Sequence, residues 1–411
     1  MAEHLLVVML IDGVSEHYFH KNRHKRPHLD HLARRGTLVN ALSPEICGTS
    51  LPGRSAILTG VDSSRHGVYG NQLFDPSQGR FRNAHPDDLR VPTVLARAKQ
   101  AGRQVAAVGF GMAHPRDTQV YIGPWWARDM IRGRHDEMDR NDKIWEQAAG
   151  IVDPKNYLAE LTALGLDTEF VQVPSDEPGH LIRGTLADQQ VVDLVAGLGC
   201  STRRPDLIIA EIGMPDHALH TFGYDSPEAE WSVRLADAQI GTLMMRLREH
   251  AVPTNLVILS DHGHMDMQHA INVTALTDLP HSCEGQTILI GNTDPAAMTR
   301  VDHALRELHC EQWPDHVLPI DAQGSVRLYV APEGYSFENC ADSSEIVVSP
   351  SALSTHGLRP GHPRDHRLCL LAGPDIPTGQ INASQPGQVT ATIAHLLGID
   401  NPLHAFANPL L

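Results

Sequence analysis

The sequence predicts an α/β fold in which a doubly wound, mostly parallel β-sheet is flanked by helices. Short apolar runs recur along the chain, and each is followed by a segment whose apolar residues have helical spacing. A run that is apolar at every position suits a central parallel strand, because helices cover both faces of such a strand. The alternation of strands with helices is typical of a doubly wound sheet. The predicted strands are 5–11, 104–110, 206–212, 255–260 and 368–372.

Helices are predicted where apolar residues recur at intervals of three and four. The segment 111–153 lacks a regular pattern, and we expect an excursion of loops and helix there. The predicted helices are 27–35, 50–59, 91–100, 182–198, 227–249 and 389–397.

The pattern changes after residue 271 and returns at residue 351. Alternation of apolar and polar residues between these points indicates short strands with one buried face. We therefore expect a small α+β insertion at 272–350 that caps the site, and a core formed by residues 1–271 and 351–411. The predicted strands of the insertion are 286–290, 325–330 and 345–348, and its predicted helix is 296–308.

The composition limits the partners of the chain. Its 411 residues include 33 Lys and Arg against 49 Asp and Glu, a formal net charge of −16, without a basic run. Nucleic-acid backbones and anionic membranes attract clustered positive charge, so we expect neither a nucleic-acid polymer nor a membrane as a partner. The apolar run at 5–11 is too short to span a membrane, and no Lys or Arg precedes it as in a secretory signal. We therefore expect a cytoplasmic protein.

Cysteine and histidine usage indicates how a metal ion would be bound. The six cysteines include no Cys-x-x-Cys pair, which argues against a disulfide framework and against a cysteine-ligated zinc site. The chain has 26 histidines. Any metal ion would therefore be bound by imidazoles and carboxylates.

Polar side chains follow three of the predicted strands at the point where each strand ends. Asp12 follows the first strand, Asp216 and His220 come shortly after the third, and Asp261-His262 follow the fourth. The carboxyl ends of parallel strands meet at one edge of a sheet, where ligands bind. Carboxylates gathered there would repel each other unless a divalent cation offsets their charge. Mixed carboxylate and imidazole ligands favour zinc, or manganese in its place.

A second candidate centre is the predicted helix at 50–59. Pro52 lies just inside its start and Gly60 follows its end, as is typical of helix boundaries. The hydroxyl of Ser50 would feel the positive end of the helix dipole, which favours an alkoxide and a bound phosphate. Ser50 or Thr49 would equally serve as a simple N-cap, so this segment alone does not decide its function.

Taken in chain order, these motifs resemble those of the alkaline phosphatase superfamily, in particular its branch of nucleotide pyrophosphatases/phosphodiesterases and phosphonoacetate hydrolases. The resemblance extends to residues 393–399, which are similar to the C-terminal helix of that branch, and it implies an alkaline phosphatase-like fold. The motifs that carry it are Asp12, the segments 50–60 and 66–71, Asp216 with His220, Asp261-His262-Gly263, and His356-Gly357 before Gly373-Pro374.

The resemblance implies a hydrolase of phosphate esters, of the phosphodiester or nucleotide pyrophosphate type, that binds two Zn²⁺ ions. Ser50 would be the nucleophile and would form a phosphoseryl intermediate. We expect His264 and His362 to be neighbours of the site, and His362 is an alternative ligand to His356. The implied metal ligands are Asp216, His220 and His356 for one ion, and Asp12, Asp261, His262 and the Ser50 oxygen for the other.

The chain departs from the diesterase branch near the nucleophile. That branch typically has a Thr nucleophile and, three positions later, an Asn that contacts a phosphoryl oxygen. This chain has Ser50 and Gly53 at these positions. Because glycine has no side chain, we expect Arg54, Asn71 or a backbone amide to contact the substrate.

Four other functions remain open. A phosphonoacetate hydrolase would present a Lys pair to its substrate, and the segment 111–153 contains no such pair. Ser50-x-Pro52-x-Arg54 also resembles the signature of sulfatases, so a sulfatase or phosphonate monoester hydrolase would use a modified Ser50 and one calcium ion. Cofactor-independent phosphoglycerate mutases share the catalytic domain, and a non-enzymatic metal-binding protein is the fourth alternative. The cations of the segment are Arg116, Arg128, Arg132, Arg134, Arg140 and Lys143.

The expected partner is a small-molecule phosphate ester or phosphonate, and a homodimer is left open. Trp125 and Trp126 would either stack on a nucleobase or aryl leaving group, or belong to the core.

Overall fold

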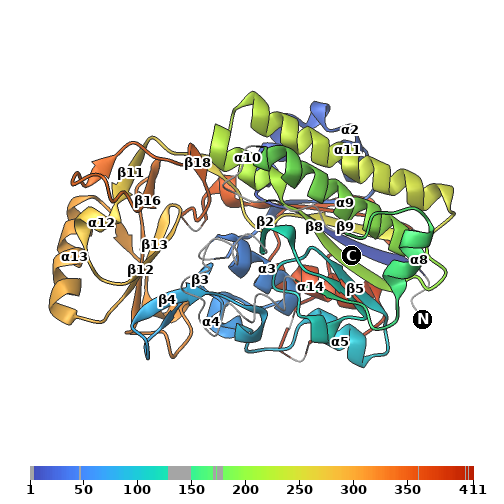
Figure 1. The fold of residues 1–411 in the computed structure, drawn as a ribbon, viewed down its shortest axis with the longest axis horizontal. Coiled ribbons are helices and arrows are strands. Elements are labelled where there is room, and N and C mark those ends of the chain that lie inside the picture. The colour runs from blue at the N-terminus through green and yellow to red at the C-terminus, as the bar shows by residue number, and fades with distance from the viewer. Residues whose placement is uncertain are drawn as a thin grey trace.

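The computed structural model describes residues 4–45, 48–127, 150–169, 173, 179–359, 361–402, 404–405 and 407–411. Helices cover both faces of its largest sheet (Figure 1), and the predicted doubly wound α/β fold is confirmed. In spatial order, the nine strands of this sheet are β20 (Gly379–Ile381), β2 (Thr37–Leu42), β19 (Arg367–Ala372), β9 (Thr254–Leu259), β1 (Leu5–Ile11), β8 (Leu207–Ile212), β5 (Val105–Val108), β6 (Val120–Ile122) and β7 (Ile151–Val152).

Two layers of helices pack on this sheet because its central strands are apolar on both faces. In β1, Leu6 and Val8 belong to the hydrophobic core on one side of the sheet, whereas Val7 and Met9 belong to the core on the other side. The first layer contains α3 (Ser50–Thr59), α5 (Val94–Gln100) and α14 (Pro386–Leu396), and the second contains α1 (Glu16–Lys21), α2 (Pro27–Arg35), α9 (His180–Cys200), α10 (Met214–Phe222) and α11 (Pro227–Glu249).

The strand directions agree with the prediction at the centre of the sheet and differ at one side. β1 pairs in parallel with both β8 and β9, so the carboxyl ends of these three strands lie at one edge. β19, predicted as another central strand, is antiparallel to both β9 and β2. β2 was not predicted, because the polar Asn40 interrupts its apolar run. β19 is buried at every position, so its apolar pattern does not distinguish it from the parallel strands beside it.

Residues of the predicted insertion form two further sheets, drawn in yellow to orange in Figure 1. Helix α13 (Pro295–Glu307) packs on the four-stranded sheet through a separate hydrophobic core. β11 begins at His269, so the second sheet starts before the predicted boundary at 272. The strands are β12 (His281–Glu284), β13 (Thr287–Gly291), β15 (Val326–Val330) and β14 (Glu311–Gln312) in one sheet, and β16 (Tyr335–Glu338), β11 (His269–Asn272) and β17 (Val347–Val348) in the other.

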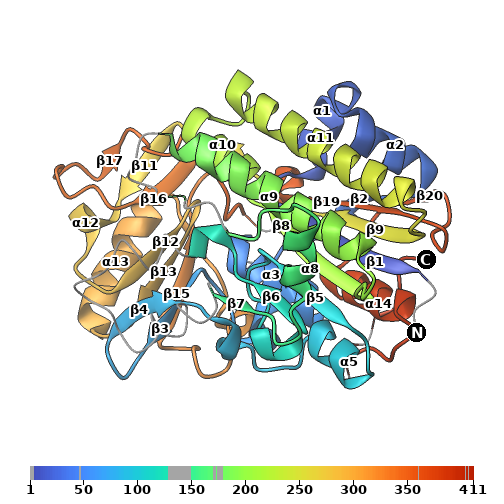
Figure 2. The same cartoon turned by 45° about the vertical axis from the view of Figure 1, so that its right-hand side comes forward.

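Short elements connect the core to these sheets. The hairpin of β3 (Gln72–Asp75) and β4 (Arg80–Asn83) lies against the four-stranded sheet (Figure 2). β10 (Met265–Asp266) pairs with β18 (Ser354–Thr355) where the chain enters and leaves the insertion. The remaining helices are α4 (Ser63–His66), α8 (Tyr157–Ala163) and α12 (Val273–Leu276), with 3₁₀ turns η1 (Arg23–Lys25), η2 (Pro86–Asp88), η3 (Pro115–Asp117), η4 (Asp315–Val317) and η5 (Pro363–Asp365).

Within these described ranges, no helix combines the length and the apolar character that crossing a membrane requires.

Candidate metal centre

Three neighbouring parallel strands bring most of the predicted site residues to one edge of the sheet. Asp12 directly follows β1, and Asp261 and His262 come just after β9. β8 leads into α10, which carries Asp216 and His220 one turn apart. Because β9, β1 and β8 are adjacent in the sheet, these side chains converge on one place.

Two further residues reach this place from other elements. Ser50 is the first residue of α3, in the helical layer on the opposite side of the sheet from α10. His356 follows β18, on the segment that returns from the insertion to the core. The centre is therefore assembled from both helical layers and from the end of the insertion.

Ser50, Asp12, Asp261 and His262 form what we call the Ser50-side cluster. Nε2 of His262 lies 3.2 Å from Oγ of Ser50, 3.3 Å from Oδ1 of Asp12 and 3.6 Å from Oδ2 of Asp261. Nδ1 of His262 lies 3.2 Å from the backbone carbonyl of Gly263. A carbonyl only accepts, so Nδ1 of His262 carries the proton and Nε2 presents a lone pair to the cluster.

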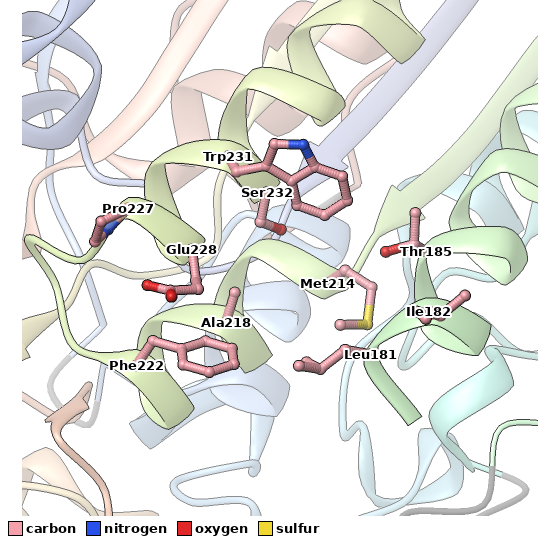
Figure 3. Close-up of a pocket in the computed structure, with 10 residues that line it drawn as sticks. All are labelled: Leu181, Ile182, Thr185, Met214, Ala218, Phe222, Pro227, Glu228, Trp231 and Ser232. Atoms are coloured by element: carbon pink, nitrogen blue, oxygen red, sulfur yellow. The ribbon is translucent and has the colours of Figure 1, made fainter. Parts of the chain in front are cut away.

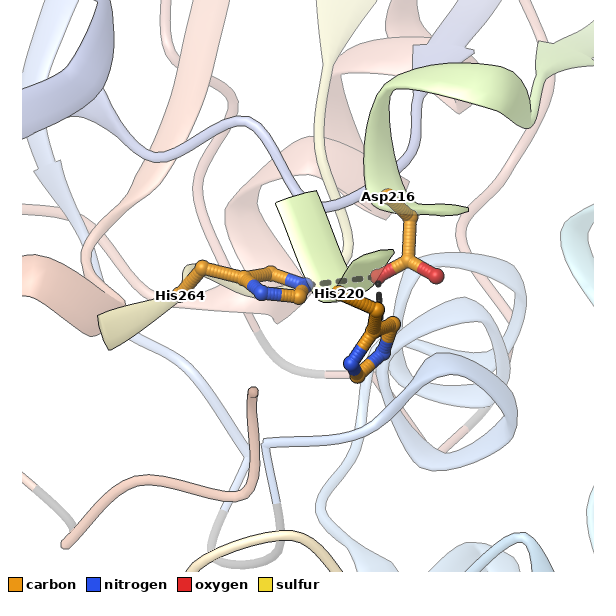
Figure 4. Close-up of side chains that lie close together, drawn as sticks. All are labelled: Asp216, His220 and His264. Carbon is orange, nitrogen blue, oxygen red and sulfur yellow. Dashed lines mark hydrogen bonds and ion pairs between the residues drawn. The ribbon is translucent and has the colours of Figure 1, made fainter. Parts of the chain in front are cut away.

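Asp216, His220 and His356 form the Asp216-side cluster. Nε2 of His220 lies 3.6 Å from Oδ1 of Asp216, and His264 approaches the same oxygen (Figure 4). The ring centroid of His356 lies 4.8 Å from that of His220 and 4.4 Å from that of His262. Nε2 of His262 is also 3.9 Å from Oδ1 of Asp216, so the two clusters adjoin each other.

The residues present fit metal ions. Two ligands of a tetrahedral zinc ion, each about 2.0–2.1 Å from the metal, lie roughly 3.3 Å apart. The atom spacings of 3.2–3.6 Å in the Ser50-side cluster match this value. In the described part of the chain, Oδ1 of Asp12 and Nδ1 of His356 are buried without a hydrogen-bond partner. A cation at the centre would satisfy the buried oxygen of Asp12.

The electrostatics also favour a cation. Burial raises the pKa of Asp12 well above its ordinary value, against the attraction of Arg54, and the nearby Asp261 raises this pKa further. Burial likewise opposes ionisation of Asp216, but the facing imidazoles, His220 first, hold the pKa of Asp216 well below its ordinary value. A divalent ion would stabilise the charged form of both carboxylates.

The structure corrects the predicted role of Arg54 as a substrate contact. Its side chain is fully buried. The guanidinium donates to Oδ2 of Asp12 at 2.6 Å, to Oδ2 of Asp261 at 2.5 Å and to Oε2 of Glu211 at 2.8 Å. A buried cation engaged by three carboxylates is not available to a substrate, and Arg54 instead offsets the negative charge behind the Ser50-side cluster.

Asn71 lies beside the nucleophile, as the prediction of a substrate contact requires. Its Oδ1 accepts a hydrogen bond of 2.9 Å from the backbone N–H of Leu51, the residue after Ser50. Gly53 packs against the backbone of Asp261, and a Cβ at this position would lie 2.5 Å from the carbonyl oxygen of Asp261. The Asn that the diesterase branch typically has three positions after its nucleophile would therefore not fit here without a backbone shift.

Trp125 and His362 are engaged outside the two clusters, whereas Trp126 contacts Glu211 behind the Ser50-side cluster. Nε1 of Trp125 donates to Asp188 at 2.9 Å in a buried cluster, and the indole of Trp126 donates to Glu211. Trp125 is thus a core residue, as one of the two predictions had it. His362 caps η5 through a bond from the Arg364 N–H and belongs to none of the candidate metal groups of the described residues.

Most of the cationic segment falls outside the described residues. Of its six cations, only Arg116 is described, and it pairs with Asp87 at 2.7 Å. The others, Arg128, Arg132, Arg134, Arg140 and Lys143, lie outside the described ranges.

An apolar pocket of about 370 Å³ lies between α9, α10 and α11 (Figure 3). By their spacing along α10, the residues of this helix that line the pocket lie on the other face from Asp216 and His220. Met214, Ala218 and Phe222 of α10 line the pocket, together with Trp231 of α11 and Ile182 of α9. Because α10 separates this pocket from the imidazoles, it is not part of the metal centre.

Two buried residues of the centre were not predicted in these roles. Glu211, in the otherwise apolar β8, accepts from Arg54 and from the Gly111 N–H. An acidic residue inside an apolar strand is unusual, and this feature of the sequence could have identified Glu211. His264 was expected only as a neighbour, and its contacts with Asp216 and Ser354 depend on strand pairing that the sequence does not show.

Comparison with known sequences agrees with this geometry. Residues 6–352 match the model of the family described as type I phosphodiesterase / nucleotide pyrophosphatase. An uncharacterized pyrophosphatase/phosphodiesterase of Schizosaccharomyces pombe is 24% identical over 265 residues, which are 63% of this chain and 44% of that protein. The chain thus matches less than half the length of this curated relative.

Solved structures share the fold across the whole chain. Murine ectonucleotide pyrophosphatase / phosphodiesterase 5 superposes with a TM-score of 0.68 at 18% identity, covering 99% of this chain and 97% of the murine chain. An inactive Thr-to-Ala variant of the murine protein, in complex with AMP, gives the same values. The human protein gives a TM-score of 0.68 at 17% identity, covering 97% and 96% of the two chains. At these identities the likeness shows the alkaline phosphatase-like fold.

Proposed function

Because the chain belongs to the type I phosphodiesterase/nucleotide pyrophosphatase family of the alkaline phosphatase superfamily, we propose that it hydrolyses phosphodiester or pyrophosphate bonds of small molecules with Ser50 as the nucleophile. The family is one of metal-dependent hydrolases. The observation that carries the proposal is the position of the Ser50 hydroxyl, 3.2 Å from Nε2 of His262 and within a group of buried carboxylates. A hydroxyl placed among metal ligands is suited to nucleophilic attack on phosphorus.

We propose two zinc sites. Asp216, His220 and His356 would hold one ion, and the Ser50-side cluster would hold the other. When bound, zinc lowers the pKa of a coordinated hydroxyl and offsets the negative charge of phosphoryl oxygens.

The residues of this chain supply the remaining parts of the proposed reaction. Oγ of Ser50 attacks phosphorus, the bond to the leaving oxygen breaks, and a phosphoseryl intermediate forms. The start of α3 directs its helix dipole at the phosphoryl group. Asn71 accepts from Leu51 through its oxygen, which leaves its NH₂ group as a donor to a phosphoryl oxygen. Attack by water on the phosphoseryl group then restores Ser50.

We propose that the insertion limits the size of the substrate. Glu284 of β12 is buried, and its carboxylate accepts from the backbone N–H groups of Asn71 at 3.0 Å and Gln72 at 3.2 Å. On the returning segment, the N–H of Gly357 donates to the carbonyl of Gly48, close to Ser50. These contacts support a cap at 272–350 that is attached directly to the nucleophile segment.

A substrate panel tests the function. The parent chain, purified with zinc, should hydrolyse an aryl phosphodiester and a dinucleotide or nucleotide pyrophosphate faster than an aryl phosphomonoester. Nucleotides belong in the panel because the murine relative was solved in complex with AMP. The Ser50→Ala variant should lose at least about 10³-fold in kcat/KM, since it lacks the nucleophile. Full activity in Ser50→Ala and in Asp216→Ala would overturn the proposal.

The same panel separates the alternatives. Faster turnover of phosphonoacetate or of a sulfate ester than of any phosphodiester would favour a phosphonoacetate hydrolase or a sulfatase. Interconversion of 2- and 3-phosphoglycerate would favour a mutase. Metal analysis adds a second test, because about two zinc ions per chain are expected here, one calcium for a sulfatase, and none for an incomplete site.

A further inference from the structure

His264 approaches Asp216 more closely than His220 or His262 does. Its Nε2 lies 2.7 Å from Oδ1 of Asp216, and its Nδ1 lies 3.1 Å from Oγ of Ser354. Both His264 and Ser354 are fully buried. The backbone carbonyl of Ser354 also lies 2.9 Å from Nδ1 of His220. One serine therefore contacts both histidines that face Asp216.

The acceptors determine which nitrogen of each ring carries the proton. The carbonyl of Ser354 only accepts, so Nδ1 of His220 is protonated and Nε2 of His220 presents a lone pair. The carboxylate of Asp216 also only accepts, so Nε2 of His264 is protonated and Nδ1 of His264 accepts from the Ser354 hydroxyl. The two imidazoles beside Asp216 are thus opposite tautomers.

The distances to Oδ1 of Asp216 also distinguish His220 from His264. Nε2 of His220 lies 3.6 Å from Oδ1 of Asp216, a spacing that two ligands of one zinc ion can adopt. The 2.7 Å between His264 and Asp216 is shorter than the roughly 3.3 Å expected for two ligands and typical of a hydrogen bond to a carboxylate.

We propose that His264 is a positioning residue of the metal centre, which holds Asp216 through an Nε2–H donor and is itself held by Ser354. The inference rests on the proposed metal site and adds to it a residue that orients a ligand without binding the metal. The pairing of β10 with β18 places the two partners, because His264 precedes β10 and Ser354 opens β18, opposite Asp266. The segment that returns from the insertion therefore orients both Asp216 and His220.

The test measures zinc affinity of the full-length chain by competition with a chelator. His264→Met removes the donor and should weaken one of the two zinc sites by about 10- to 100-fold, with the other unchanged. His264→Gln keeps an N–H donor at a similar reach and should restore most of the affinity. Ser354→Ala keeps the carbonyl for His220 but removes the hydroxyl, and should give an intermediate loss.

A matched control is His281→Gln in β12. Both nitrogens of His281 are hydrogen-bonded, to the Leu279 carbonyl at 2.7 Å and to Oδ1 of Asn339 at 2.8 Å, and neither partner belongs to the metal centre. This variant should bind zinc like the parent.

Three results would overturn the inference. Zinc affinities of His264→Met within twofold of the parent would show that His264 positions nothing. Failure of His264→Gln to restore affinity, with a cobalt-substituted spectrum that lacks one nitrogen ligand, would show that His264 is a ligand. A parent chain that binds no zinc would overturn both this inference and the proposed function, whereas the first two results leave the proposed function standing.

Discussion

The two clusters of the candidate metal centre contain similar side chains but are supported in different ways. Behind the Ser50-side cluster, Asp12 and Asp261 share the buried cation Arg54 with Glu211. On the Asp216 side, a single carboxylate is supported by the imidazole of His264, and no Arg or Lys forms an ion pair with Asp216 in the described part of the chain. The comparison indicates that charge balance organises one cluster and hydrogen-bond direction the other.

Removing Arg54 should have the largest effect on stability. Arg54→Ala leaves three buried carboxylates without their shared cation, which should lower the free energy of unfolding by about 3–5 kcal/mol. Arg54→Lys retains the charge but lacks a planar fork of donors, so it should recover only part of this loss. Urea unfolding of the zinc-loaded chains measures the stability of both variants. An Arg54→Ala chain as stable as the parent would show that Arg54 does not balance the charge of these carboxylates.

Removal of zinc from a single site should come next. With free zinc at 100 to 1,000 times its Kd, chelation should lower the free energy of unfolding by about 2.7–4.1 kcal/mol per site that binds only the folded chain. Asp12→Asn and Asp216→Asn should each bind one zinc ion fewer. Chelation should then lower their free energy of unfolding by the contribution of one site only, as measured by metal analysis and thermal unfolding. Loss of both ions in either variant would show that the clusters are not separable.

Removing the acceptor at the start of α10 should weaken zinc binding at the Asp216-side cluster alone. Asp188 is buried and accepts from the backbone N–H groups of Gly213 at 3.0 Å and Met214 at 2.8 Å, at the start of the helix that carries Asp216. Asp188→Ala leaves buried donors unpaired and should cost about 1–3 kcal/mol of stability. Calorimetric titration with zinc should show weaker binding at one site only.

Asp294→Ala is the control for this variant. Asp294 accepts from the N–H groups of Ala296 and Ala297 at the start of α13, in the insertion. It should lose some stability while its zinc affinities stay those of the parent. Equal weakening of both zinc sites in Asp188→Ala would mean that α10 does not act on the Asp216 side specifically.

The smallest effect is expected on kcat/KM, from a substitution of Glu284 where the insertion contacts Asn71. Glu284→Gln replaces one of the two acceptors for the Asn71 and Gln72 amides, at a cost of about 1 kcal/mol, or roughly a fivefold loss in kcat/KM on a phosphodiester. Glu338→Gln, whose carboxylate accepts from Ser351 just after the insertion, should leave kcat/KM unchanged. Equal kcat/KM values for the two variants would remove the support for a cap that acts on Asn71.

The sequence was a good guide to elements and a partial guide to the site. The bounds predicted for the strand at 5–11 and for the helices at 50–59 and 227–249 are those of the structure. The structure brings the seven predicted metal ligands together. Asp12, Asp261 and His262 follow adjacent strands. The others are Ser50 on α3, Asp216 and His220 on α10, and His356 after β18. The structure buries Arg54 among carboxylates that lie within or just after three different strands.

The sequence by itself determined the order of strands and helices and the residue types at the strand ends, because apolar periodicity and turn chemistry are local properties of the chain. Only the tertiary structure decided that β19 runs antiparallel, that Arg54 is a buried cation and that His220 and His264 are opposite tautomers. Each of these depends on which donor or acceptor a distant segment places opposite the residue. The histidine proposed to orient Asp216 and the one proposed to bind metal differ in their contacts with Ser354, which lies 134 residues after His220.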